Sequence, residues 1–234
     1  MNIVALAGIL SIIVLFSACK KDLDTVNNQS SVAGLMAFNL IPGNTAVGIA
    51  LSGSNLLNSP LGYTNYTGGY TGVYAGTREV ESYDYYTGST LAAATQFFED
   101  SSYYSVFVAG TNGKYSNIIV KDNLDSLSST TGAFVRYVNA IPDSVRKPLV
   151  NISSNGTNVF NDNAAFATVS NFKEITPGDI FVKVNDESAI NANRTITLEK
   201  GKIYTVLLVG KPAATDSTQA VQIKYIQNGQ VSDQ

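Results

Sequence analysis

The sequence repeats itself once, at a spacing of about 100 residues. Segment 33–44 aligns without gaps with 133–144, and 104–110 aligns with 204–210 at the same spacing. The identical pairs are Ala33/Ala133, Asn39/Asn139, Ile41/Ile141, Pro42/Pro142, Tyr104/Tyr204, Val106/Val206 and Gly110/Gly210. Between these matches the spacing becomes 102, which pairs Tyr70 with Phe172, Val73 with Ile175, and Gly76 with Gly178. A period this long indicates two tandem domains rather than a solenoid.

Both copies have the sequence pattern of β-strands. Apolar runs end at Pro42 and Pro142, and later segments alternate apolar and polar residues before Gly or Asn turns. Segment 89–100 is compatible with a short helix or a strand. We therefore expect an all-β protein with two tandem immunoglobulin-like β-sandwiches of roughly seven strands each. The predicted boundaries are 32–121 for the first sandwich, 122–132 for a linker, and 133–234 for the second sandwich.

Three motifs of the second copy resemble one known family. "VNAIPD" (138–143), "FKEITPGD" (172–179) and "KGKIYTVLLVG" (200–210) are similar to domain of unknown function 4397, and the first copy is a divergent version. The family occurs in secreted and lipid-anchored bacterial proteins. The resemblance implies immunoglobulin-like sandwiches and supplies no catalytic residues.

The N-terminus resembles the signal peptide of a bacterial lipoprotein. An apolar run from Ile3 to Phe16 is followed by Ser17, Ala18 and Cys19, the only cysteine in the chain. We expect cleavage after residue 18, a diacylglycerol and an added acyl chain such as palmitate on Cys19, and a polar tether over 19–31. "CKKD" looks like the start of mature Bacteroidota lipoproteins, which predicts an outer-membrane, cell-surface location with the membrane as partner.

Alternatives to this interpretation stay open. The segment could be an uncleaved signal anchor, or Cys19 could be incidental. The segment before the apolar run lacks Lys and Arg, so translation could start upstream of Met1.

Composition argues against several classes of function. The chain has no His, one Cys and a formal net charge of −3, which disfavours metal sites, acid–base catalysis by His, and nucleic-acid binding. Carboxylates cluster where turns are expected, without the spacing of a calcium loop or an established glycosidase pair. They are Glu81, Asp84, Glu99, Asp100, Asp162, Asp186 and Glu187. We expect no enzymatic activity and no cofactor.

Seven of the 13 tyrosines lie between residues 62 and 86. Tyr70, opposite Phe172, is expected in the core. At the spacing of 102, five others face non-aromatic residues: Tyr63/Ala165, Tyr66/Thr168, Tyr74/Thr176, Tyr85/Glu187 and Tyr86/Ser188. These five are candidates for stacking on sugar rings.

Two further sets of polar residues stand out. Asn39 and Asn139 precede equivalent Ile-Pro turns, and either bond neighbouring backbone groups or share a ligand contact; we favour the first. Four triplets resemble the O-glycosylation acceptor motif of the Bacteroidota, with acceptors Thr25, Ser126, Ser144 and Ser217.

Three functions remain open. The first is a non-enzymatic envelope protein with a structural or binding role, whose partner is an extracellular glycan or protein. The second is a glycan-binding surface lipoprotein that uses the exposed tyrosines. The third is a subunit of a surface fibre or adhesin in which an edge strand accepts a partner strand. The oligomeric state does not follow from the sequence.

Overall fold

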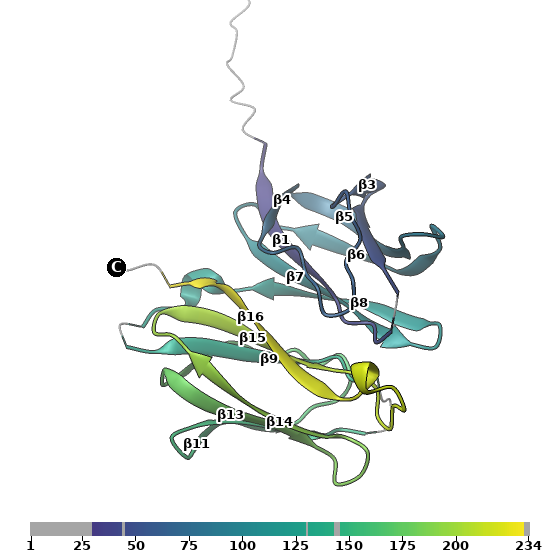
Figure 1. Ribbon diagram of the computed structural model, residues 1–234. Helices are drawn as coiled ribbons and strands as arrows, with labels where there is room; N and C mark the ends of the chain where they lie inside the picture. The colour runs from purple at the N-terminus through teal and green to yellow at the C-terminus, as the bar shows by residue number, and fades with distance from the viewer. Residues whose placement is uncertain (1–29, 44, 130, 143–145, 232–234) are drawn as a thin grey trace, which may run out of the picture. The chain divides into compact units, whose positions relative to one another are not determined.

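The computed structural model describes residues 30–43, 45–129, 131–142 and 146–231, and their regular structure is almost entirely β. Sixteen strands form four four-stranded sheets (Figure 1), and all of these strands belong to one compact unit. Two sheets come from the first copy of the repeat and two from the second. The predicted all-β fold with two tandem sandwiches is therefore confirmed, with eight strands in each sandwich where we expected about seven.

The first sandwich pairs the sheets β4-β1-β7-β8 and β3-β2-β5-β6. The strands of the first sheet are β1 (Val32–Asn39), β4 (Thr71–Tyr74), β7 (Tyr103–Thr111) and β8 (Lys114–Asp122). The strands of the second are β2 (Val47–Leu51), β3 (Ser54–Asn55), β5 (Gly76–Asp84) and β6 (Thr90–Phe98). Segment 89–100, whose sequence was compatible with a short helix or a strand, contains strand β6.

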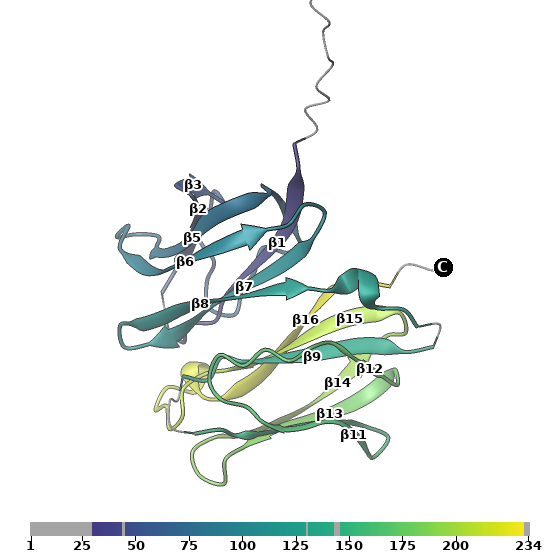
Figure 2. The same cartoon turned by 180° about the vertical axis from the view of Figure 1, so that it is seen from behind.

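The second sandwich repeats this topology with the sheets β12-β9-β15-β16 and β11-β10-β13-β14 (Figure 2). The strands of the first sheet are β9 (Ala133–Asn139), β12 (Lys173–Ile175), β15 (Lys202–Val209) and β16 (Gln222–Gln230). The strands of the second are β10 (Leu149–Ser154), β11 (Thr157–Asn163), β13 (Gly178–Asn185) and β14 (Asn191–Leu198). In both copies the first strand runs parallel to the seventh, β1 with β7 and β9 with β15.

The segment between the sandwiches is short and contains a 3-10 helix, η1 (Leu124–Ser126). Asp122, which the composition placed in the linker, is the last residue of β8 and is only 3% exposed. A second 3-10 helix, η2 (Ser217–Gln219), lies between β15 and β16.

Strands β7 and β15 are buried on both faces, as their near-continuous apolar sequences predict. Val106 and Val108 of β7 point into the core of the first sandwich. Phe107 and Ala109, which alternate with them, belong to a separate cluster that contains residues of both sandwiches. We call it the shared cluster; its buried residues are Met36, Phe38, Leu40, Phe107, Ala109, Val138, Ala140, Leu207, Val209 and Ile226.

An ion pair is buried beside the shared cluster. Arg136 of β9 is 2% exposed, and its Nη1 donates to Oδ1 of Asp122 at 2.5 Å. Its Nη2 donates to Ser105 Oγ at 2.9 Å and its Nε to Thr205 Oγ1 at 3.0 Å. The ring of Phe172 covers the guanidinium, with 4.4 Å from Cζ to the ring centroid. Arg136 of the second sandwich is thus bonded to two buried side chains of the first.

Candidate functional site

The first part of the tyrosine-rich segment packs on the shared cluster. Tyr63, Tyr66 and Tyr70 are partly buried against it, and the ring of Tyr66 stacks on Phe38 with centroids 5.4 Å apart. Burial raises the pKa of Tyr63 to about 12. These rings are part of the scaffold rather than free binding groups.

The backbone explains why the sequence alignment suggested otherwise. Asn39 donates to the carbonyl of Leu61 and Asn139 to that of Ala164, so this loop is equivalent at a spacing of 103 rather than 102. Two backbone hydrogen bonds give the same spacing of 103. The N–H of Thr64 donates to the carbonyl of Asn39, and the N–H of Ala167 donates to the carbonyl of Asn139.

At this spacing the counterparts of Tyr63 and Tyr66 change. They are Phe166 and Val169, which also pack on the shared cluster. The alignment of Tyr63 with Ala165 and of Tyr66 with Thr168 was therefore wrong. The extra residue lies in Gly68-Gly69, because one residue, Asn171, takes the equivalent place in the second copy.

Tyr70 is core-like, as expected. Its hydroxyl donates to Oδ2 of Asp122 at 2.6 Å and its ring meets Tyr103 edge-on. Burial raises the pKa of Tyr70, and the negative charge of Asp122 raises it further.

Tyr85 and Tyr86 lie in the turn between β5 and β6. Asp84 fixes this turn by accepting hydrogen bonds from the backbone N–H groups of Tyr86 and Thr87, and the bond from Thr87 is the main cause that holds the pKa of Asp84 below its usual value. Tyr85 Oη donates to the carbonyl of Asn58 at 3.1 Å, and Tyr86 is 79% exposed. Asp186 forms the equivalent turn with Ser188, so the spacing of 102 holds here.

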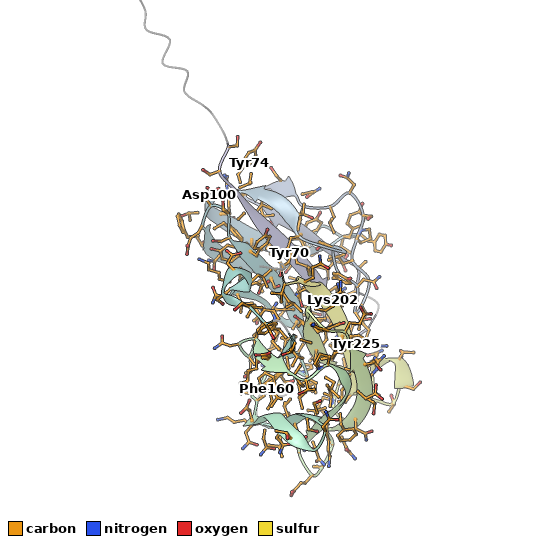
Figure 3. All side chains as sticks on the ribbon, turned by 90° about the vertical axis from the view of Figure 1, so that its left-hand side faces the viewer. Tyr70, Tyr74, Asp100, Phe160, Lys202 and Tyr225 are labelled. Carbon is orange, nitrogen blue, oxygen red and sulfur yellow. The ribbon has the colours of Figure 1, made fainter. Side chains whose placement is uncertain are left out.

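Tyr74 lies at the other end of β5 from Tyr85. It pairs with Val32 across strands β4 and β1 and is 64% exposed. Figure 3 shows it at the end of the first sandwich where the described chain begins, away from Tyr70. The nine residues of β5 separate Tyr74 from Tyr85, which corresponds to roughly 30 Å of extended chain. The candidate tyrosines thus do not form one surface.

Tyr74 lines a cleft of about 440 Å³ at the side of the first sandwich where β3 and β4 are the edge strands. We call this the Tyr74 cleft. Its apolar lining includes Leu51, Leu56 and Val73, and its polar lining includes Ser54, Asn55, Thr71 and Arg78. The guanidinium of Arg78 lies over the Tyr74 ring, 6.0 Å from its centroid. An exposed ring beside hydrogen-bonding groups and an apolar floor is the arrangement of a small-molecule or sugar site.

Several of the other candidate residues form hydrogen bonds or ion pairs within the protein. Asn39 and Asn139 are buried, and each accepts from the N–H two residues later while donating to backbone carbonyls. Among the carboxylates, Glu99 pairs with Lys121, Asp100 accepts from the Val32 N–H, and Asp186 pairs with Arg146. In the described part of the chain, no three His, Cys, Asp or Glu side chains are grouped to hold a metal ion.

Two of the predicted glycosylation acceptors are described, and both are exposed. Ser126 is the last residue of η1, and Ser217 is the first of η2, after Asp216. Cys19, Thr25 and Ser144 lie outside the described residues. Across residues 30–231, gaps aside, no helix has the length and apolar character to cross a membrane.

Two tandem four-plus-four-stranded sandwiches of one topology define a tandem β-sandwich protein. The chain belongs to the family named domain of unknown function 4397, which matches residues 33–144 and 133–233. No curated protein matches the chain.

Two solved structures from Bacteroides were found by structural similarity. One, from Bacteroides ovatus, is provisionally described as a cell adhesion protein; it is 8% identical, with a TM-score of 0.26, over 86% of this chain and 99% of that one. A second from Bacteroides eggerthii, described in the same way, is 9% identical, with a TM-score of 0.22, over 86% of this chain and 96% of that one. Similarity at this level carries no inference about the chain.

Proposed function

We propose that the chain is a non-enzymatic, lipid-anchored protein of the outer cell surface whose first sandwich binds an extracellular glycan in the Tyr74 cleft. The exposed ring of Tyr74 beside Arg78, over an apolar floor, is the observation that carries the binding role. Sugar rings present C–H faces that stack on aromatic side chains, and their hydroxyls bond to side chains such as Ser54, Asn55 and Thr71. The second copy has Thr176 in place of Tyr74, so the fold does not require the ring there.

The lipid anchor rests on Cys19 and the segment before it. Two or more acyl chains are needed for stable attachment to a membrane. A Cys19→Ala variant is expected to leave the membrane fraction, whereas a Thr25→Ala control remains there. The intact mass of the membrane-extracted wild type should exceed that of the polypeptide by its acyl groups. Further mass that disappears when Thr25, Ser126, Ser144 and Ser217 become Ala identifies glycans on those acceptors. A wild-type protein found in the soluble fraction contradicts the anchor.

Glycan binding is tested on a glycan array with Ser31–Gln234, the compact unit. Replacement of Tyr74 by Ala should reduce binding roughly tenfold, because a stacking contact of about 1 kcal/mol and its buried area are lost. Tyr225→Ala is the matched control, since Tyr225 is an exposed tyrosine of the second sandwich. Equal binding by the Tyr74→Ala variant and the wild type places the site elsewhere, and an array with no bound glycan contradicts the binding role.

One observation favours assembly as a second candidate function. Strand β6 is an edge strand of nine residues without a charge or proline, and its Phe97 is 58% exposed. Edges without a charge or proline can accept strands from other chains, although Asn117 of β8 already donates to the Ala92 carbonyl of β6. If β6 is an assembly edge, sedimentation will show mass that rises with concentration and is lost in a Thr95→Lys variant. A monomer at high concentration contradicts this candidate.

A further inference from the structure

Arg78 has no acidic partner among the described residues, in contrast to the two arginines in ion pairs. Arg136 pairs with Asp122 and Arg146 with Asp186, each at 2.5 Å. The contacts of Arg78 are to the carbonyls of Tyr74 and Ala75, both at the long distance of 3.4 Å. Arginine carries five N–H donors in a fork that matches a carboxylate. Most of the hydrogen-bonding capacity of Arg78 is therefore unused within the part of the chain that the structure describes.

The position of Arg78 directs this unused capacity into the cleft. Side chains alternate along a strand, and Arg78 lies on the same side of β5 as the buried residues Val80 and Ser82. Glu79, which follows it, is exposed on the opposite face. Among the described residues that line the Tyr74 cleft, Arg78 is the only charged one. The described lining of the cleft thus carries one positive charge in a chain whose formal net charge is −3.

A single sugar residue can use both groups of the pair. The guanidinium carbon lies over the Tyr74 ring, 6.0 Å from its centroid, so a sugar that stacks on the part of the ring that Arg78 leaves open has the guanidinium within reach of a substituent at its edge. A carboxylate in that place would accept charge-assisted hydrogen bonds, which are stronger than those of a neutral hydroxyl. Ser54, Asn55 and Thr71 remain for the hydroxyl groups of the sugar.

We infer that the Tyr74 cleft selects acidic saccharides, with Tyr74 stacking on a uronate ring and Arg78 binding its carboxylate. This inference rests on the proposed glycan-binding function and narrows its ligand class. It assigns Arg78 to specificity and Tyr74 to affinity for both charged and neutral sugars.

The test uses an array on which each uronate-containing oligosaccharide is printed both as the free acid and as its methyl ester. The ester keeps the ring and hydroxyls and removes only the charge. Wild-type Ser31–Gln234 should bind the acids roughly tenfold more tightly than the esters, as expected for one charge-assisted hydrogen-bonding contact. Arg78→Gln should abolish this preference, whereas Tyr74→Ala should weaken binding to both forms. Lys114→Gln removes a positive charge of the same sandwich outside the cleft and should change neither.

The outcomes separate the inference from the function it rests on. Equal binding of acid and ester by the wild type, or binding of neutral glycans alone, overturns the selection of acidic sugars and leaves glycan binding intact. A preference for acids that survives in Arg78→Gln overturns the role of Arg78. If no saccharide binds in either form, the proposed glycan-binding function fails, and the inference fails with it.

Discussion

Replacement of Arg136 by Ala is expected to destabilise the compact unit by roughly 3–5 kcal/mol, the usual cost of removing one partner from a buried ion pair. Asp122 would stay buried with a charge that, among the described residues, keeps hydrogen bonds from Ser105 and Tyr70. A loss of this size is a large part of the 5–15 kcal/mol that is typical of a domain. Urea unfolding of Ser31–Gln234 measures it, and Glu99→Gln is the matched control. Glu99 pairs with Lys121 at the surface, where an ion pair contributes about 1 kcal/mol or less.

A double variant distinguishes the ion pair from the packing around it. The repeat places Met36 opposite Arg136, and the Ser105–Asp122 hydrogen bond corresponds to the Thr205–Asn228 bond. Arg136→Met combined with Asp122→Asn therefore gives both copies the same side chains at these positions. Because the charges are removed together, we expect this variant to recover most of the stability that Arg136→Ala loses. A single-variant loss below about 1 kcal/mol would contradict a buried contact between the sandwiches.

How far the sequence could predict this contact depends on the residue. The apolar runs of β7 and β15 correctly indicated burial on both faces, because a strand with one wet face alternates and these do not. Arg136, the charged residue within the apolar run of β9, was a signal of a buried ion pair that the sequence does contain. Asp122 offered none, since a carboxylate beside Asn and Leu in a polar stretch has the composition of a linker. Asp122 meets its partner Arg136 only in the folded structure.

The candidate site was only partly predictable for a related reason. Tyr74 and the Tyr85/Tyr86 pair were correctly aligned with Thr176 and with the residues of the equivalent turn, because strands and turns keep a constant spacing. The loop before β4 does not keep a constant spacing, because Gly68-Gly69 contains one residue more than its counterpart in the second copy. The aligned residues on either side of the loop hide this difference. Arg78 could not be recognised from sequence, because its distance to Tyr74 and its lack of an acidic partner among the described residues are properties of the fold.

The second large effect is the loss of stability that we expect when Asn39 or Asn139 is replaced. It also tests the hypothesis, favoured from the sequence, that both side chains bond neighbouring backbone groups. Asn39 donates to the carbonyls of Thr45 and Leu61, both at 2.8 Å, and accepts from the Ile41 N–H at 3.0 Å. Asn39→Ala leaves three backbone groups without this partner, each costing about 1–3 kcal/mol where it is buried. We expect a loss of roughly 3 kcal/mol or more in urea unfolding.

Asn139 provides the internal comparison. Among the described residues it makes one such donation, to the carbonyl of Ala164, and it accepts from the Ile141 N–H. Asn139→Ala leaves two described backbone groups unpaired, and we expect it to lower the free energy of unfolding by roughly 2 kcal/mol. On these described bonds, this loss is smaller than the loss expected for Asn39→Ala. A loss of stability at both positions is the outcome that backbone bonding requires.

An Asp in place of Asn139 adds a pH dependence whose sign follows from the same geometry. The new carboxylate would be buried facing a carbonyl oxygen, so its folded-state pKa would lie above the unfolded value of about 3.9. The protonated form can still donate, and stability is therefore retained below about pH 4 and lost as the pH rises through the raised folded-state value. If the Ala and Asp variants instead keep wild-type stability at neutral pH while ligand binding is lost, the two asparagines are ligand contacts. Their burial at 0% and 1% exposure argues against that outcome, because a ligand could reach neither amide without opening the sandwich.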